Sequence, residues 1–350
     1  MSDEVKTALA TVVDGGSLTV NEARTAMGSV MDGEATPALL AALLVALRMR
    51  GETVDELTGF ATAMRERVLR VDAPEGAVDT CGTGGDGSGT FNISTAAALV
   101  VAAAGVPVAK HGNRAVTSKS GSADVLDALG VRIDHDAASA GVALREIGFA
   151  FLFALGFHPA MKHAGPTRRE IGVRTAFNLL GPLTNPAGAR RQVVGVADPA
   201  TAPKLAAVLH RLGVERAFVV GGDGIDELPL DGTGTIHDVT AAGIEVRSVD
   251  AAALGLTRAG NNRLAGGSPA DNAAIIETIL RGEPGSRRDV VVLNAAAALV
   301  VAGVAATLED GVDRAALTID AGLGSELLER LRAERRTADA ARADREAAPA

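Results

Sequence analysis

The sequence contains no tryptophan and no tyrosine, and its only large aromatic residues are eight phenylalanines. Proteins that bind single-stranded nucleic acids stack bases on aromatic side chains, and this chain offers few such platforms. Basic residues are also in the minority, with 34 lysines and arginines against 43 acidic residues and a net charge of −9. Nucleic-acid binding depends on a positively charged surface. We therefore expect no nucleic-acid partner and a core of alanine, valine and leucine.

Cysteine and long apolar runs are scarce as well. Cys81 is the only cysteine, which excludes an internal disulfide and a metal site made of several cysteines. The longest apolar stretches, residues 96–109 and 295–306, are shorter than the roughly 20 residues that a membrane-spanning helix needs. The first ten residues lack the basic and apolar pattern of a secretion signal. These observations predict no membrane partner and a cytoplasmic location.

Residues 3–70 have the patterns of helices throughout. Thr19 and Glu22 have the spacing of a capping box, and Pro37 follows Thr36 at the start of the next apolar stretch. The segment 72–76 contains proline, glycine and two acidic residues, which is typical of a linker. We expect residues 1–72 to form a small all-helical domain.

From residue 76 onward, strand and helix patterns alternate. This alternation predicts a large α/β domain with a central, mainly parallel sheet flanked by helices. We expect strands at 78–80, 106–109, 149–153, 193–196 and 217–220, an antiparallel pair at 233–239 and 244–249, and helices at 93–104, 124–129, 141–147, 203–212, 269–281, 289–302 and 312–335. The tail, residues 337–350, has no apolar stripe and is expected to be disordered.

Two strand–loop–helix units stand at the centre of the chain. The first strand leads into a loop with five glycines, at positions 82, 84, 85, 87 and 89, before the helix that follows Asn92. The second strand leads into a loop that runs from Lys110 to Ser122, the expected N-cap of the next helix. The carboxyl ends of parallel strands meet at one edge of a sheet, where α/β proteins bind ligands.

The chemistry of these two loops is complementary. Glycines allow the first loop to wrap closely around phosphate oxygens with its backbone N–H groups, and Ser94 and Thr95 lie at the N-terminus of a helix. The second loop carries Lys110, His111, Arg114 and Lys119 and is strongly basic. Together the loops predict a site for a small, highly phosphorylated ligand.

Two well-known phosphate motifs do not fit the glycine loop. The spacing Gly82-x-Gly84-x-x-Gly87 matches the dinucleotide fingerprint, but the helix begins too late and the second strand ends in Lys110 where a ribose-binding acid is required. A Walker loop would need lysine and serine or threonine after its glycines, and Gly87-Ser88-Gly89 lacks them. The site therefore belongs to another class.

Three segments resemble the signature segments of the anthranilate phosphoribosyltransferase family, in the class III superfamily of nucleoside phosphorylases and phosphoribosyltransferases: residues 82–86 (GTGGD), 92–95 (NIST) and 110–114 (KHGNR). The likeness extends over about residues 5–330. It implies transfer of the phosphoribosyl group of phosphoribosyl pyrophosphate (PRPP) to anthranilate in tryptophan biosynthesis, with pyrophosphate as the other product. It also implies that a segment at about 160–184 returns to the helical domain, so that residues 76–159 and 185–336 form the PRPP-binding domain.

The resemblance implies PRPP contacts in both loops and a magnesium site nearby. The implied PRPP-binding residues are Gly82, Gly85, Asp86, Thr90, Asn92, Ile93, Ser94, Thr95, Lys110, His111, Gly112, Asn113, Arg114, Ser118 and Ser122. The implied Mg²⁺ ligands are Ser94, Asp226 and Glu227, which suits a hard cation with oxygen ligands. Without the resemblance, an adjacent Asp-Glu pair in a loop would be expected simply to face solvent.

The acceptor site is implied by a second group of residues. Arg168 is the candidate to hold the anthranilate carboxylate, because a guanidinium binds a carboxylate bidentately, and its neighbour Arg169 is the rival. Gly82, Asn113 and His158 are further implied anthranilate contacts, although His158 could equally be a structural histidine. His111 has the same two interpretations.

Two other functions remain as alternatives. A pyrimidine nucleoside phosphorylase has the same architecture, but its phosphate loop differs from Cys-Gly-Thr-Gly-Gly-Asp. An inactive relative that binds nucleic acid would be expected to lose Asp226, Glu227 or Arg168, all of which are present. The resemblance further implies a homodimer formed through the helical domain.

Overall fold

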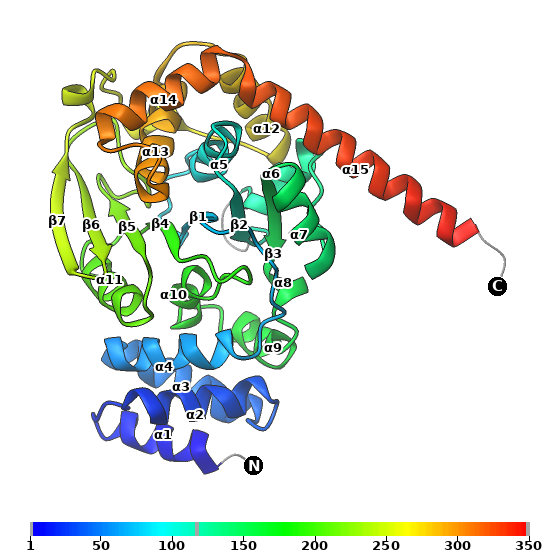
Figure 1. Cartoon of the computed structure of the whole chain (residues 1–350). Coiled ribbons are helices and arrows are strands. Elements are labelled where there is room, and N and C mark those ends of the chain that lie inside the picture. Colours follow the sequence, from blue (N-terminus) through cyan, green and yellow to red (C-terminus); the bar gives the residue numbers. More distant parts are fainter. Residues whose placement is uncertain (1–2, 116–118, 348–350) are drawn as a thin grey trace.

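The computed structural model describes residues 3–115 and 119–347. Its N-terminal part is a bundle of four helices that lies beneath the rest of the molecule in Figure 1: α1 (Asp3–Val13), α2 (Val20–Met31), α3 (Pro37–Arg50) and α4 (Val54–Arg65). The predicted capping box at α2 is confirmed, since Thr19 accepts a hydrogen bond from the Glu22 amide and the Glu22 side chain accepts one from the Thr19 amide. Pro37 is the first residue of α3, as predicted.

The remainder is an α/β unit around one seven-stranded sheet. The strands are β1 (Val78–Gly82), β2 (Val108–Gly112), β3 (Phe149–Phe153), β4 (Arg191–Gly195), β5 (Arg216–Gly221), β6 (Gly234–Thr240) and β7 (Gly243–Val249). Their order is β3-β2-β1-β4-β5-β6-β7; the first five are parallel, and β6 and β7 are antiparallel additions at one edge. The predicted fold class is confirmed.

Helices cover both faces of this sheet (Figure 1). The helices that follow the bundle are α5 (Ile93–Ala103), α6 (Ser122–Ala128), α7 (Ala137–Glu146), α8 (Ala154–Phe157), α9 (Met161–Ile171), α10 (Phe177–Leu180), α11 (Ala202–Arg211), α12 (Pro269–Leu280), α13 (Ser286–Ala302), α14 (Leu308–Asp320) and α15 (Leu323–Ala347), with 3₁₀ turns at Gly181–Leu183, Ala251–Leu254 and Asn261–Leu264. No helix in the described ranges is both long and apolar enough to cross a membrane.

Small side chains build the core on one face of the sheet. Helices α5 and α13 pack against each other, and most of their residues are buried alanines, valines and leucines. Alanine lets two helices approach closely, and this replaces the bulk that aromatic residues supply in other cores. The buried α5 holds its N-terminus, with Ser94, at the carboxyl end of β1.

A second core joins the helical bundle to the α/β unit. It runs from α1–α4 through α9 and α10 to α11 and the opposite face of β4 and β5. Helix α9 packs on α2 and α3, and α10 packs on α4. The Arg65 side chain also donates to the Leu183 carbonyl at 2.6 Å. The segment between residues 160 and 184 therefore contacts both parts of the molecule.

Several predicted helix boundaries were wrong. The helix expected at 141–147 begins at Ala137, and the helix expected at 289–302 begins at Ser286. Ser122 is the first residue of α6 and not its cap: the cap is Gly121, whose amide donates to the Asp124 carboxylate at 3.0 Å. Asp124 is the third residue of the helix, and its carboxylate thus accepts a hydrogen bond from a free amide at the helix N-terminus. The single helix predicted over 312–335 is two helices, because Gly322 adopts a left-handed conformation with φ of 75° and turns the chain.

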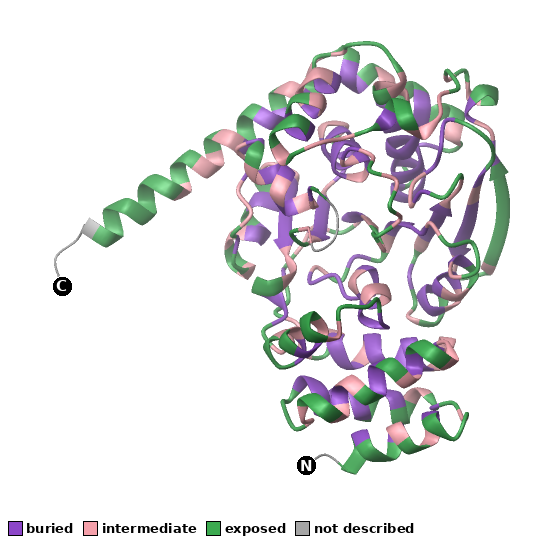
Figure 2. Cartoon of the chain, turned by 180° about the vertical axis from the view of Figure 1, so that it is seen from behind, coloured by how far each residue is buried: buried purple, intermediate pink, exposed green. Residues whose placement is uncertain are grey.

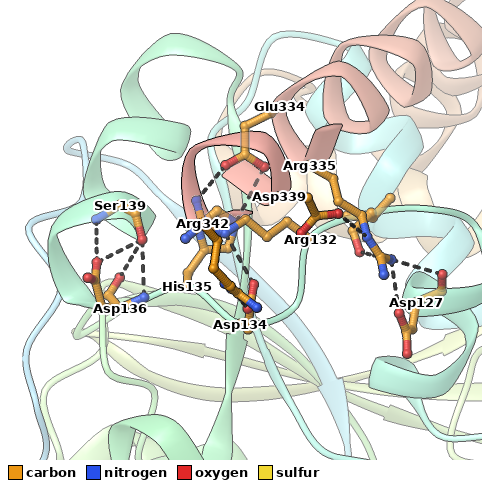
Figure 3. A network of polar contacts seen from close by, with 11 residues as sticks. Asp127, Arg132, Asp134, His135, Asp136, Ser139, Glu334, Arg335, Asp339 and Arg342 are labelled. Atoms are coloured by element: carbon orange, nitrogen blue, oxygen red, sulfur yellow. Dashed lines mark hydrogen bonds and ion pairs between the residues drawn. The ribbon is translucent and has the colours of Figure 1, made fainter. Parts of the chain in front are cut away.

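The expected disordered tail is also corrected, since α15 continues to Ala347. Alanine, arginine and glutamate are strong helix formers, and they dominate this segment. Figure 2 shows the second half of α15 extending from the body as an exposed helix. A polar network holds α15 to the end of α6 and the loop after it (Figure 3): Arg335 donates to the Asp127 carboxylate at 2.9 Å, Arg132 donates to Glu334 at 2.9 Å, and Arg342 pairs with Asp134.

Candidate active site

The glycine loop follows β1 and packs against the loop after β5. Gly84, Gly85, Gly87 and Gly89 all have φ between 62° and 71°, which only glycine adopts freely. The Gly84 amide donates to Asp226 Oδ2 at 2.8 Å. A Cβ on Gly82 would lie 2.4 Å from the same oxygen, so glycine is required there for the two loops to meet.

Asp226 and Glu227 lie beside the N-terminus of α5. Glu227 Oε1 accepts a hydrogen bond from the Ser94 amide at 2.9 Å. Burial raises the pKa of Asp226 to about 6, helped by the charge of Asp86, and burial together with the charge of Asp226 raises the pKa of Glu227 to about 8. The two carboxylates therefore lack sufficient positive charge around them. Ser94, Asp226 and Glu227, predicted as a ligand set, are brought together.

These oxygen donors suit a hard cation but do not complete its shell. Within residues 3–115 and 119–347, no group of three or more histidine, cysteine, aspartate or glutamate side chains is arranged to hold a metal ion. Mg²⁺ prefers octahedral oxygen coordination, commonly one or two carboxylates with phosphate oxygens and water. The residues present fit an ion that takes its other ligands from a phosphorylated substrate.

Lys110 points under the strand ends and not into the open loop. It is 2% exposed, and its ammonium group donates to the Thr80 carbonyl. Burial lowers its pKa, whereas the nearby carboxylates of Asp79 and Glu227 act to raise it. Asp79 is fully buried and accepts a hydrogen bond from the His111 amide at 3.2 Å. Lys110 is thus a buried cation whose charge acts on the acidic pair from below the sheet edge.

His111 and His158 form a buried pair. Their ring centroids are 5.1 Å apart, and His111 Nδ1 shares a hydrogen bond with the Gly181 carbonyl at 3.2 Å. The Nε2 atoms of both rings are buried without a hydrogen-bond partner among the described residues. Burial lowers the pKa of His111 to about 3 and that of His158 to about 4, so both rings are neutral near pH 7.

The second loop folds back on α6. Arg114 is exposed and makes ion pairs with Asp124 at 2.8 Å and Asp127 at 3.3 Å, which direct it away from the glycine loop. The Asn113 carbonyl accepts from the Ala123 amide at 3.2 Å. A Cβ on Gly112 would lie 2.3 Å from Ser122 Oγ, so the start of α6 packs tightly on the end of β2. Ser118 lies outside the described residues.

Asn92 is held by residues that the sequence did not indicate. Its Nδ2 donates to the Ser120 carbonyl at 3.1 Å, and its Oδ1 accepts from Ser120 Oγ at 3.1 Å and from Asn272 Nδ2 at 2.9 Å. Asn272 lies on α12, is 2% exposed and also accepts from the Gly267 amide at 2.8 Å. This amide chain joins the glycine loop, the second loop and α12.

The remaining predicted PRPP contacts differ in how accessible their side chains are. The Asp86 carboxylate accepts from the Ser88 amide at 3.1 Å and its hydroxyl at 2.8 Å, which closes the tip of the glycine loop. Thr90 forms a bridge with Ala265 and is half-buried. Ile93 and Thr95 are each only 1% exposed, so neither side chain reaches the surface of the site.

Arg168 and Arg169 differ in their burial. Arg168 is half-buried, its guanidinium lies 4.8 Å from the ring centroid of Phe177, and burial lowers its pKa. Arg169 is exposed on α9. A third arginine, Arg174, was not predicted; it donates to the Thr83 carbonyl of the glycine loop at 3.0 Å.

The family models match in two parts. Residues 74–324 match the glycosyl transferase family a/b domain, and residues 6–68 match the helical bundle domain of the same family. Together with the helical bundle and the sheet described above, these matches define a glycosyl transferase composed of a helical and an α/β part.

Individual relatives narrow this class. The anthranilate phosphoribosyltransferase of Pelotomaculum thermopropionicum is 54% identical over 321 residues, which cover 91% of this chain and 93% of the relative. The crystal structure of the anthranilate phosphoribosyltransferase from Thermus thermophilus aligns with a TM-score of 0.89 and 46% identity, covering 94% of this chain and 99% of that one. The Saccharomyces cerevisiae enzyme, solved with PRPP and Mg, shares the fold with a TM-score of 0.88 at 24% identity, over 96% of this chain and 99% of that one. The chain belongs to the anthranilate phosphoribosyltransferase family, as its signature segments indicated.

Proposed function

We propose that this protein transfers the phosphoribosyl group of PRPP to the amine of anthranilate, forming N-(5-phosphoribosyl)anthranilate and pyrophosphate, as a step of tryptophan biosynthesis. One observation carries this proposal. The glycine loop and the N-terminus of α5 donate backbone N–H groups to Asp226 and Glu227, the acidic pair that follows β5. Phosphate-binding amides and a cation-binding pair thus share one sheet edge.

Mg²⁺ is the cofactor that the donor set supports, with Ser94, Asp226 and Glu227 as its protein ligands. When bound, the ion would neutralise charge on the pyrophosphate group. Its charge would also offset the burial and the mutual repulsion that raise the pKa values of Asp226 and Glu227. The yeast relative was solved with PRPP and Mg, which supports Mg²⁺ as the ion.

The protein's own residues position and neutralise the reactants. Amides of the glycine loop and α5 donate hydrogen bonds to the phosphate oxygens, and Lys110 adds positive charge from beneath. The ribose C1–O bond to pyrophosphate breaks as the anthranilate nitrogen bonds to C1, and that nitrogen then releases a proton. An aromatic amine is uncharged near pH 7, so alignment contributes more than a strong base.

The acceptor lies toward the segment that returns to the helical bundle. Arg168 holds the anthranilate carboxylate, while Gly82, Asn113 and His158 line the remainder of the site. His111 and His158 are uncharged near pH 7, so Arg168 supplies the positive charge that attracts the carboxylate.

We further propose that residues 1–72 and about 160–184 act as one unit that faces the PRPP-binding part. We also propose that the protein is a homodimer and that it works in the cytoplasm.

The decisive test is the loss of anthranilate fluorescence after PRPP and Mg²⁺ are added to the purified protein. The chain has no tryptophan or tyrosine, so it contributes almost no background signal. We expect a decrease that needs both PRPP and Mg²⁺ and stops when EDTA is added. An unchanged signal, combined with phosphorolysis of a pyrimidine nucleoside, would replace this proposal with the phosphorylase function.

A further inference from the structure

Arg174 lies directly on the glycine loop. Its Nη2 donates to the Thr83 carbonyl at 3.0 Å, and a Cβ built on Gly85 would lie 1.9 Å from its Nη1. The guanidinium therefore rests on the backbone of the loop, at a place where every side chain other than hydrogen would displace it. Gly85 has φ of 71°, so glycine is favoured there for two independent reasons.

The charge of Arg174 is not balanced within the protein. Among the described residues, no carboxylate lies within ion-pair distance of it. Arg114, the arginine that the sequence placed in the phosphate site, is committed to Asp124 and Asp127. Lys110 is buried beneath the strand ends. An exposed, unpaired guanidinium on a loop that binds phosphate is suited to bind an anion of the ligand.

The position of Arg174 in the chain links it to the acceptor side. It lies between α9, which carries Arg168, and α10, whose Phe177 contacts the Arg168 guanidinium. Gly172 ends α9 in a left-handed conformation with φ of 68°, and the chain then turns toward the glycine loop. One short segment thus presents Arg168 to one substrate and Arg174 to the loop of the other.

We propose that Arg174 binds the pyrophosphate group of PRPP and thereby ties the segment of the acceptor site to the donor. This inference rests on the proposed function. When PRPP occupies the loop, the Arg174 guanidinium donates hydrogen bonds to phosphate oxygens, either in addition to its bond to the Thr83 carbonyl or in place of it. A planar guanidinium can accommodate both, because its five N–H donors point in several directions.

The test compares Arg174→Gln and Arg174→Lys with wild type, using Arg314→Gln as the matched control. Arg314 is exposed on α14 and its side chain forms no ion pair among the described residues, so its removal changes net charge equally. We expect Arg174→Gln to raise the KM for PRPP and the inhibition constant of inorganic pyrophosphate by about 10- to 100-fold, the value of a lost charge-assisted hydrogen bond. The KM for anthranilate should change less than threefold.

Arg174→Lys should recover part of the PRPP affinity, since it keeps the charge but not the planar fork. The inference is overturned if Arg174→Gln binds pyrophosphate as Arg314→Gln does, or if only kcat falls, which would indicate that Arg174 merely supports Thr83. Wild-type protein that neither binds PRPP nor consumes anthranilate would instead refute the proposed function. Thermal melts of all variants verify that each is folded.

Discussion

Two adjacent carboxylates at the end of β5 illustrate how burial sets the properties of single residues. Burial raises the pKa of Glu227 to about 8, far above that of a glutamate in an unfolded chain. Between about pH 4.5 and pH 8 the folded state therefore holds more protons than the unfolded state, and stability falls as the pH rises through this interval. A residue that destabilises the free protein is expected where a ligand supplies the missing charge.

Glu227→Gln should therefore separate stability from activity. Without Mg²⁺, we expect the variant to melt at a higher temperature than wild type at pH 8, with a smaller difference at pH 5, where the wild-type carboxyl is protonated. Turnover of anthranilate should fall by about 100-fold or more, because a metal ligand is lost. Differential scanning fluorimetry and the fluorescence assay measure both effects. Glu283→Gln, an exposed glutamate after α12, is the control; equal melting shifts in both variants would contradict the prediction.

Arg168 and Arg169 provide a matched pair for the acceptor site. Arg168 is half-buried on Phe177, and its guanidinium has no protein acceptor among the described residues, whereas Arg169 faces solvent. We expect Arg168→Gln to raise the KM for anthranilate by about 10- to 100-fold, as expected when a bidentate bond to a carboxylate is removed. Arg169→Gln should stay within about threefold of wild type. The reverse result would transfer the carboxylate contact to Arg169.

Local sequence predicted some residues of the candidate site well and others not at all. The glycines and Ser94 follow a strand whose carboxyl end lies at the ligand-binding edge, so strand–helix alternation indicates them. The Asp-Glu pair is indicated only by the resemblance to the family. Arg174 and Asn272 had no local signal, since their partners Thr83 and Asn92 lie 91 and 180 positions away. The ion pairs of Arg114 with α6 were equally hidden. Long-range hydrogen bonds depend on the finished packing and not on local pattern.

At the scale of elements, α15 shows why the end of the fold was mispredicted. A segment without an apolar stripe has the pattern of a disordered tail, yet the charges of α15 are matched by acids and bases of the loop after α6 (Figure 3). Arg335 donates to the carbonyls of Asp127 and Val131, near the C-terminus of α6, in addition to the Asp127 carboxylate. Amphipathic patterning detects apolar contacts but not such polar capping of one helix by another.

Removing residues 337–350 should therefore have a small effect. The truncation removes two exposed ion pairs, Arg342 with Asp134 and Arg335 with Asp339, which contribute about 1 kcal/mol or less each. We expect reduced helical signal in far-UV circular dichroism, a slightly lower melting temperature and unchanged turnover. Arg335→Ala in the full chain should cost about 1–2 kcal/mol, because it leaves carbonyls near α6 without their donor. A truncation more damaging than Arg335→Ala would contradict this interpretation.

His135 lies beneath α15 and should make the stability of the folded protein sensitive to acid. It is 7% exposed, its Nδ1 has no partner among the described residues, and burial lowers its pKa to about 4. Between pH 6.5 and pH 4 the His135 imidazole is protonated in the unfolded chain but not in the folded protein. Stability is therefore lost as the pH falls through this interval. His135→Leu should flatten this dependence by about 1–3 kcal/mol at about pH 4 in urea titrations. An unchanged slope would show that His111 and His158 dominate.

At the scale of the whole molecule, the topology of the sheet explains where the site lies. The parallel strands β2, β1, β4 and β5 end at the same edge of the sheet, and the apolar core shared by α4, α10 and α11 fixes the helical bundle beside that edge. A core rich in alanine holds these layers close together without large aromatic residues. The net charge of −9 leaves the surface acidic, so the unpaired cations of the site contrast with their surroundings.

The predicted homodimer can be tested on the face of the helical bundle. Among described residues, Met49 is 83% exposed and Val45 37% exposed on α3, and Val13 at the end of the neighbouring α1 is 66% exposed. Apolar side chains gathered on one element favour burial against a second copy, and a stable interface needs roughly 800 Å² from each partner. Met49→Lys should therefore shift the protein from dimer to monomer at micromolar concentration in analytical ultracentrifugation. Leu317→Lys, which removes a similarly exposed leucine from α14, is the control. If both variants remain dimeric, the dimer forms elsewhere; if the wild type is monomeric, the homodimer prediction fails.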